Sequence, residues 1–111
     1  MYMQSWADNL LLVDLSREPD LELDLETILD TVLESGQCDV VMDFSEVDII
    51  HSTSLATLVR IQKLLRDCAH SLVLCSVAPA TKGIFEVTEL AELFDIREDR
   101  FAALATVGSL P

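Results

Sequence analysis

The 111-residue chain is poor in aromatic residues, at 5%, and has only seven basic residues against 20 acidic ones. Its formal net charge of −13 disfavours contact with nucleic-acid phosphates and anionic lipid headgroups. No apolar run approaches the ~20 residues that span a bilayer. The N-terminal MYMQSWADNL lacks the basic region that opens a secretory signal. We therefore expect a cytoplasmic protein without nucleic-acid partners or direct membrane insertion.

Cysteine is also scarce, because the chain holds three and no C-x-x-C pair. An odd number of well-separated cysteines without a signal peptide indicates reduced, mostly buried thiols.

Metal and nucleotide motifs are missing as well. Neither His51 nor His70 has a cysteine, aspartate or glutamate at the spacing of a zinc site. The acidic residues 20–24 resemble the start of a calcium loop, but its glycine and distal glutamate are absent. The chain has no P-loop, Rossmann glycine pattern or G-x-S-x-G elbow. We predict no metal, no cofactor and no enzymatic activity.

Half of the residues are hydrophobic, which suffices for a core at this length. Short apolar runs predict strands, and apolar positions at helical spacing predict helices. The strands are expected over 10–15, 40–44, 72–77 and 94–96. The helices are expected over about 24–35, from 51–54 to about 68, 79–87 and 99–105. This alternation is typical of an α/β fold with a largely parallel sheet.

Residue chemistry locates some helix ends. Asp24 is expected to cap the first helix and Gly36 to end it, although the alternation in DLELDLE (20–26) also fits an exposed strand. Pro79 suits the first turn of the third helix, and Asp99 is expected to cap the last one.

The most informative segment is 40–55. There a buried strand leads through a short loop to the hydroxyls of Ser52, Thr53 and Ser54 at the start of a long helix. Ligands of open α/β sheets bind beyond the carboxyl ends of the strands, and a helix N-terminus attracts phosphate. The simplest interpretation is that these hydroxyls only cap the helix.

The stretch VVMDFSEVDIIHSTSLATLVRIQKLL resembles the signature of the STAS domain family, in which a strand ending in aspartate leads to a D-S-S-G-L-like turn. LVLCSVAPATKGIFEVTELAELFDI and REDRFAALATV resemble the family's later elements, so the resemblance covers about 38–107. It implies that residues 1–111 form a single STAS-like domain. Such a domain has a mixed, mostly parallel sheet of four to five strands and about four helices.

In the family's anti-sigma factor antagonists, the second hydroxyl of the turn is phosphorylated by a partner kinase that is often the anti-sigma factor. The matched position is Thr53, with Ser52 as second choice, and the partner-binding surface comprises His51, Ser52, Thr53 and Ser54. A phosphatase reverses the modification. The implied mechanism is electrostatic, because phosphate adds about −1.5 to −2 charges to the docking surface.

Three residues depart from the family pattern: His51 replaces aspartate, Ser54 replaces glycine, and Glu89 replaces a second common glycine. They leave open a non-phosphorylated STAS subunit or scaffold, for example of a lipid-transport ABC complex. A small enzyme or ligand binder at the same helix end is a third hypothesis.

The bases Arg60, Lys63 and Arg66 are either the solvated face of their helix or a patch that docks an acidic partner.

Overall fold

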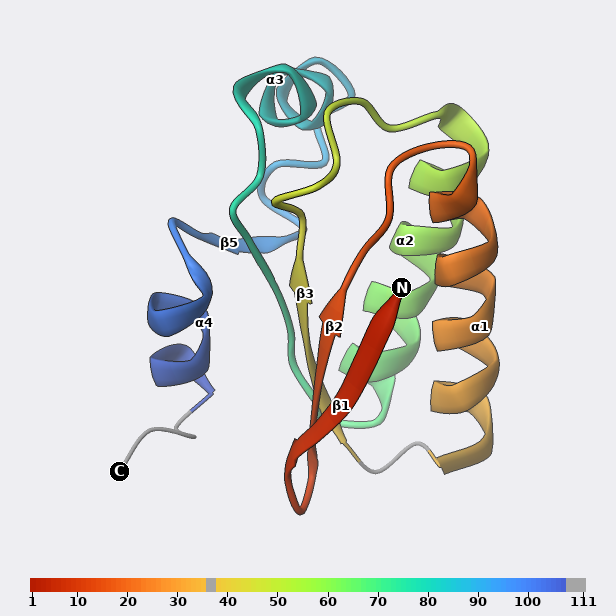
Figure 1. Cartoon of the computed structure of the whole chain (residues 1–111), viewed down its shortest axis with the longest axis vertical. Helices are drawn as coiled ribbons and strands as arrows, with labels where there is room; N and C mark the ends of the chain where they lie inside the picture. Colours follow the sequence, from red (N-terminus) through yellow and green to blue (C-terminus); the bar gives the residue numbers. More distant parts are fainter. Residues whose placement is uncertain (36–37, 108–111) are drawn as a thin grey trace.

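The computed structural model describes residues 1–35 and 38–107. Five strands form one sheet in the order β1-β2-β3-β4-β5 (Figure 1). They are β1 (Tyr2–Ala7), β2 (Leu10–Asp14), β3 (Asp39–Asp43), β4 (Leu72–Cys75) and β5 (Asp95–Arg97). Strand β1 is antiparallel to β2, and all other neighbours pair in parallel. The predicted mixed, mostly parallel α/β sheet is therefore confirmed.

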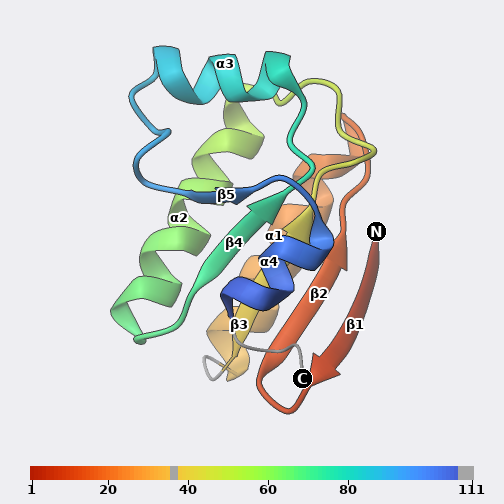
Figure 2. The same cartoon turned by 90° about the vertical axis from the view of Figure 1, so that its left-hand side faces the viewer.

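Four helices surround the sheet: α1 (Asp20–Ser35), α2 (Ser52–Asp67), α3 (Pro79–Val87) and α4 (Arg100–Thr106). Helices α1 and α2 lie side by side on one face, and α4 lies on the other (Figures 1 and 2). Helix α3 lies beyond the end of the sheet to which the parallel strands point. None of the helices in these two ranges is both long and apolar enough to cross a membrane.

The core has two parts because the sheet is covered on both faces. The larger part lies between the sheet and the α1–α2 layer. The smaller part lies under α4 and consists of Leu10, Leu12, Val41, Val73, Cys75, Ala103 and Leu104. Burial on both faces explains why β2, β3 and β4 read as continuous apolar runs.

Strand β1 was not among the strands located from the sequence. It pairs only with β2 and lies at the edge of the sheet, and of its residues only Met3 and Gln4 are even partly buried. A strand without a buried face has no alternating pattern to detect.

The start of α1 was predicted wrongly. The helix begins at Asp20 rather than near 24, so residues 20–26 are helical and not an exposed strand. Asp24 does not cap it but is buried, and its Oδ2 accepts the Ser16 N–H at 2.9 Å. The acids Asp20 and Glu22 stabilise this earlier start, because they lie at the positive end of the helix dipole. The predicted stop at Gly36 lies outside the described residues.

The remaining elements follow the predictions closely. Helix α3 has the predicted bounds, and α2 begins at Ser52, within the predicted range of 51–54. The other strand ends and α4 differ from the predictions by one or two residues. Asp99 caps α4, since its side chain accepts the Ala102 N–H at 2.8 Å.

Candidate functional site

The loop from β3 to α2 brings the chain to the sheet end where the carboxyl ends of the parallel strands lie (Figure 1). Phe44, Val47 and Ile50 bury their side chains in the main core and so fix the loop. The Phe44 N–H also donates to the carbonyl oxygen of Cys75 at 2.9 Å. The N-terminus of α2 is therefore held on a rigid support.

His51 is the N-cap residue of α2, but its side chain makes no capping hydrogen bond. Instead, its backbone N–H donates to Oε2 of Glu18 at 2.6 Å, and its Nδ1 lies 3.8 Å from the same oxygen. The Glu18 side chain is only 4% exposed, whereas that of His51 is 54% exposed. A carboxylate from the β2–α1 loop thus supplies negative charge at the positive end of α2.

Ser52 and Thr53 lie in the first turn of α2 and are exposed. Within residues 1–35 and 38–107, neither hydroxyl makes a hydrogen bond, so the interpretation of these residues as simple caps is wrong. Both hydroxyl groups are therefore accessible to a partner or a modifying enzyme. We call His51, Ser52 and Thr53 the α2 tip.

Ser54 does not belong to the surface, and its predicted place there is wrong. The residue is fully buried, and no hydrogen-bond partner for its Oγ exists in the described part of the chain. The reason is helical geometry, because Ser54 precedes Leu58 and Ile61 on the inward-facing side of α2. Two hydroxyls, rather than three, are presented at this end of the helix.

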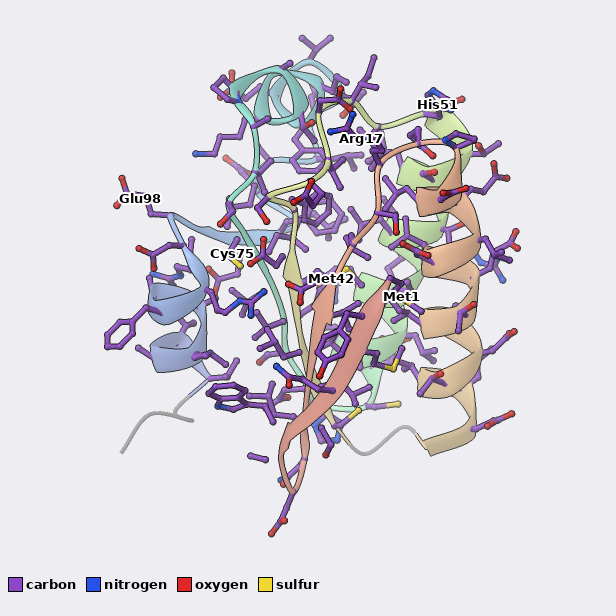
Figure 3. The ribbon with its side chains drawn as sticks, viewed as in Figure 1. Met1, Arg17, Met42, His51, Cys75 and Glu98 are labelled. Atoms are coloured by element: carbon purple, nitrogen blue, oxygen red, sulfur yellow. The ribbon has the colours of Figure 1, made fainter. Side chains whose placement is uncertain are left out.

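Sequence reasoning missed Glu18 and its neighbour Arg17, an exposed base in the same loop. Figure 3 shows Arg17 and His51 at the same end of the molecule. Adjacent parallel strands end at the same edge, so the loops after β2 and β3 were bound to meet there. The predicted order of strands therefore indicated that these two loops are neighbours, although it did not identify Glu18 as the contacting residue.

A second polar cluster lies at the same end of the sheet but on the α4 face. Arg100 forms ion pairs with Asp14 and Asp43, which end β2 and β3. Burial lowers the pKa of Arg100, but the hydrogen bond to Asp43 and the charges of both carboxylates raise it overall. Asp43 also accepts the Ser45 N–H at 2.8 Å. The aspartate at the end of β3 therefore anchors both the following turn and α4.

Among residues 1–35 and 38–107, no cluster of histidine, cysteine, aspartate and glutamate could hold a metal ion.

Comparison with known proteins identifies the family. The STAS domain matches residues 13–103. A relative from Bordetella bronchiseptica, "Putative anti-sigma factor antagonist BtrV", is 32% identical over 81 residues, which are 73% of this chain and 70% of the relative.

Solved structures share the fold. A crystal structure of a "putative anti-sigma factor antagonist" from Thermotoga maritima has a TM-score of 0.83 at 19% identity, covering 96% of this chain and 93% of that one. The anti-sigma factor antagonist SpoIIAA in its unphosphorylated form has a TM-score of 0.78 at 12% identity, covering 99% and 98%. Its phosphorylated form has a TM-score of 0.71 at 11% identity, covering 95% and 97%.

Since the STAS match extends over most of the chain and solved structures share the five-stranded sheet with its four helices, the protein belongs to the STAS domain family.

Proposed function

We propose that this protein is a non-enzymatic cytoplasmic regulator that binds an anti-sigma factor or a related serine/threonine kinase through the α2 tip. Phosphorylation of Thr53, or of Ser52 as second choice, ends that binding, and a phosphatase restores it. Membership of the STAS family and the relative named as an anti-sigma factor antagonist support a regulatory role. The existence of SpoIIAA in unphosphorylated and phosphorylated forms supports the switch.

One observation carries the proposal: the Ser52 and Thr53 hydroxyls are exposed on a rigid helix end, and neither is engaged within the described residues. A kinase must reach its target hydroxyl, and a partner must pack against it. Both conditions are met at the α2 tip but not at Ser54, which is buried. Thr53 ranks first because it matches the modified position of the family.

Charge explains how the switch works. The first base of α2 is Arg60, seven residues or ~10 Å along the helix from Thr53. The nearby Glu18 is itself an anion, and of the basic side chains at this end of the molecule, His51 already lies 3.8 Å from Glu18, while Arg17 is exposed to solvent. A phosphate on Thr53 would add negative charge to the surface that faces the partner, and the partner's fitted surface would have to desolvate it.

The decisive test is phosphorylation followed by binding. We expect a serine/threonine kinase encoded beside this gene to add one phosphate in the presence of ATP. Thr53→Ala removes most of the product, and Ser52→Ala removes little. Ser71→Ala, which changes an exposed serine directly before β4, is the matched control and leaves the reaction unchanged. Intact mass and fragment mass spectrometry locate the phosphate.

Binding supplies the second measurement. Thr53→Glu is expected to weaken binding to that kinase or its anti-sigma factor at least ~10-fold, or about 1.4 kcal/mol, by calorimetry. Failure of every neighbouring kinase to modify the α2 tip would refute the switch.

His51 and Ser54 favour a second candidate, a STAS subunit or scaffold that is never phosphorylated. It predicts co-purification with a transporter ATPase subunit and no phosphate on protein isolated from its own cells.

A further inference from the structure

Helices α1 and α2 carry opposite charges although they lie side by side (Figure 1). Helix α1, DLELDLETILDTVLES, contains six acidic residues and no base. Helix α2, STSLATLVRIQKLLRD, contains three bases and one acid. Three of the chain's seven bases are thus on a single helix, in a protein with 20 acids.

These charges are not neutralised within the molecule. Arg60 and Lys63 on α2 are exposed, as are Glu26 and Asp30 on α1. Within residues 1–35 and 38–107, none of the four belongs to an ion pair. The fold therefore leaves an acidic strip and a basic strip next to each other, both facing solvent.

A groove lined by apolar and charged side chains lies between α1 and α2. It has a volume of about 300 Å³ and is lined by Leu29, Leu33, Arg60, Lys63, Leu64 and Asp67. Leu33 is 59% exposed and borders this groove, so it offers an apolar contact between the two strips. The acidic strip, the groove with Leu33 and the basic strip together form what we call the α1/α2 face, defined by Glu26, Asp30, Leu33, Arg60 and Lys63.

We propose that the α1/α2 face binds a second copy of this chain and forms a two-fold symmetric dimer. A two-fold interface brings a surface against itself, so it must be self-complementary. An axis lying in the interface and running along the groove places α1 of each copy over α2 of the other. The acidic strip of each copy then meets the basic strip of the other copy, so the interface contains two such contacts. The two Leu33 side chains meet near the axis.

Charge also selects this axis over its alternative. A two-fold axis perpendicular to the helices would set α1 against α1, and Glu26 and Asp30 would face the same acids in the other copy. If two copies met through other surfaces, their net charge of −13 each would make them repel. The α1/α2 face combines an acidic strip, a basic strip and an exposed leucine, so a second copy is the partner it fits.

The dimer and the proposed switch use separate parts of α2. Arg60 lies ~10 Å along the helix from Thr53, so the α2 tip extends beyond the contact. The dimer can therefore be tested without reference to phosphorylation, and either proposal can fail alone.

Charge exchange tests the dimer directly. Light scattering after gel filtration, from micromolar to submillimolar protein, is expected to show the unmodified chain moving from 12.3 kDa toward twice that mass. The basic-strip variant R60E/K63E and the acidic-strip variant E26K/D30K each remain monomeric, because like charges now face each other. An equimolar mixture of the two variants recovers the dimer, since both contacts of the mixed pair again join opposite charges.

Matched controls change the same net charge elsewhere. R17E/K82E alters two exposed bases outside the face, and E86K/E92K alters two exposed acids outside it. Both are expected to dimerise to within threefold of the unmodified chain. The proposal is overturned if the unmodified chain stays at 12.3 kDa, if the mixture stays monomeric, or if the controls dissociate as far as the strip variants. Circular dichroism confirms that each exposed substitution leaves the fold intact.

Discussion

Cys75 ends β4, and its side chain is fully buried in the smaller core beneath α4. Burial, together with the smaller effect of the negative charge of Asp43, raises the pKa of this thiol from 9.0 to about 12. The folded protein thus holds the proton over a pH range in which the unfolded chain releases it.

This difference makes stability depend on alkaline pH. The stabilising contribution of Cys75 is fully present below about pH 9 and is lost as the pH rises toward about 12. We expect Cys75→Ala to be less stable than the unmodified chain at neutral pH, and the gap in the free energy of unfolding to narrow as the pH rises. Urea denaturation measures it. Cys68→Ala, which changes an exposed thiol, should follow the unmodified chain at every pH. Parallel curves for Cys75→Ala and the unmodified chain would contradict the pKa assignment.

At the residue scale, the sequence predicted the exposed start of α2 but not the orientation of every side chain there. The placement of Ser52 and Thr53 needed only the helix start, which the loop and the apolar spacing indicated. Ser54 could also have been predicted to be buried, because it precedes Leu58 and Ile61 at helical spacing. The contact between Glu18 and His51 could not, since 33 residues separate them and only the folded sheet brings them together.

At the scale of the element, the end of α3 has a conformation that suits glycine. Glu89 follows the C-cap Thr88 with φ at 60°, a region that costs an ordinary residue about 1 kcal/mol. The Leu90 N–H donates to the Phe85 carbonyl and the Glu89 N–H to the Glu86 carbonyl, at 2.7 and 3.1 Å. These two bonds form a Schellman motif, in which this position is usually glycine. The presence of Glu89 in place of the family's common glycine is therefore expected to lower the stability of this helix end.

Glu89→Gly is expected to raise the free energy of unfolding by about 0.5–1 kcal/mol, because glycine relieves the left-handed conformation but adds entropy to the unfolded chain. Thermal and urea denaturation measure the gain. The matched control is Glu86→Gly inside α3, which should destabilise by about 1 kcal/mol, as glycine does within helices. A loss of stability in Glu89→Gly would show that Glu89 has a favourable role that the cap geometry does not explain.

Helix α4 is attached to the sheet by ion pairs at its start as well as by the buried side chains of Ala103 and Leu104. It has only seven residues, and Arg100 at its start forms ion pairs with Asp14 and Asp43 on the sheet. Removing the base would leave the Asp43 side chain, which is 8% exposed, without its cation.

Arg100→Met is therefore expected to lower the free energy of unfolding by about 2 kcal/mol. This is less than for a fully buried pair, because solvent reaches 37% of the Arg100 side chain. Amide exchange in α4 should accelerate more than elsewhere. Arg97→Met removes an exposed partner of Asp95 and should change stability by less than about 0.5 kcal/mol. Equal effects of the two variants would show that α4 is held by its apolar contacts instead.

The elements that the sequence predicted well are those with a buried face. The apolar runs over 40–44 and 72–77 predicted the central strands β3 and β4 to within two residues at each end. Strand β1 was not predicted because it lies at the edge of the sheet and pairs with a neighbour on one side only. The early start of α1 was missed because Leu21 and Leu23 alternate with acids, and the alternation does not reveal that Leu21 is buried whereas Leu23 is 67% exposed.

At the scale of the whole molecule, negative charge opposes folding. The chain carries 20 acidic residues against seven basic ones, within a body only 33 × 27 × 24 Å across. At an ionic strength of 0.01 M the screening length is about 30 Å, so each acid interacts with nearly every other. At 1 M it is about 3 Å, and only direct contacts remain. Unfolding moves the like charges apart, which favours the unfolded chain most at low salt.

Salt is therefore expected to stabilise this protein at neutral pH, by roughly 1–2 kcal/mol between about 0.01 and 0.5 M NaCl. The attractive pairs that salt would weaken are few in the described ranges, and those of Arg100 with Asp14 and Asp43 are partly shielded from solvent. Urea denaturation at one fixed protein concentration measures the effect, because dimerisation would otherwise add a term of its own. An uncharged osmolyte at equal osmolality separates charge screening from solvent exclusion and should produce a smaller gain. If the free energy of unfolding falls as salt is added, attraction between opposite charges outweighs the repulsion among the excess acids. The inference from composition that repulsion dominates would then be wrong.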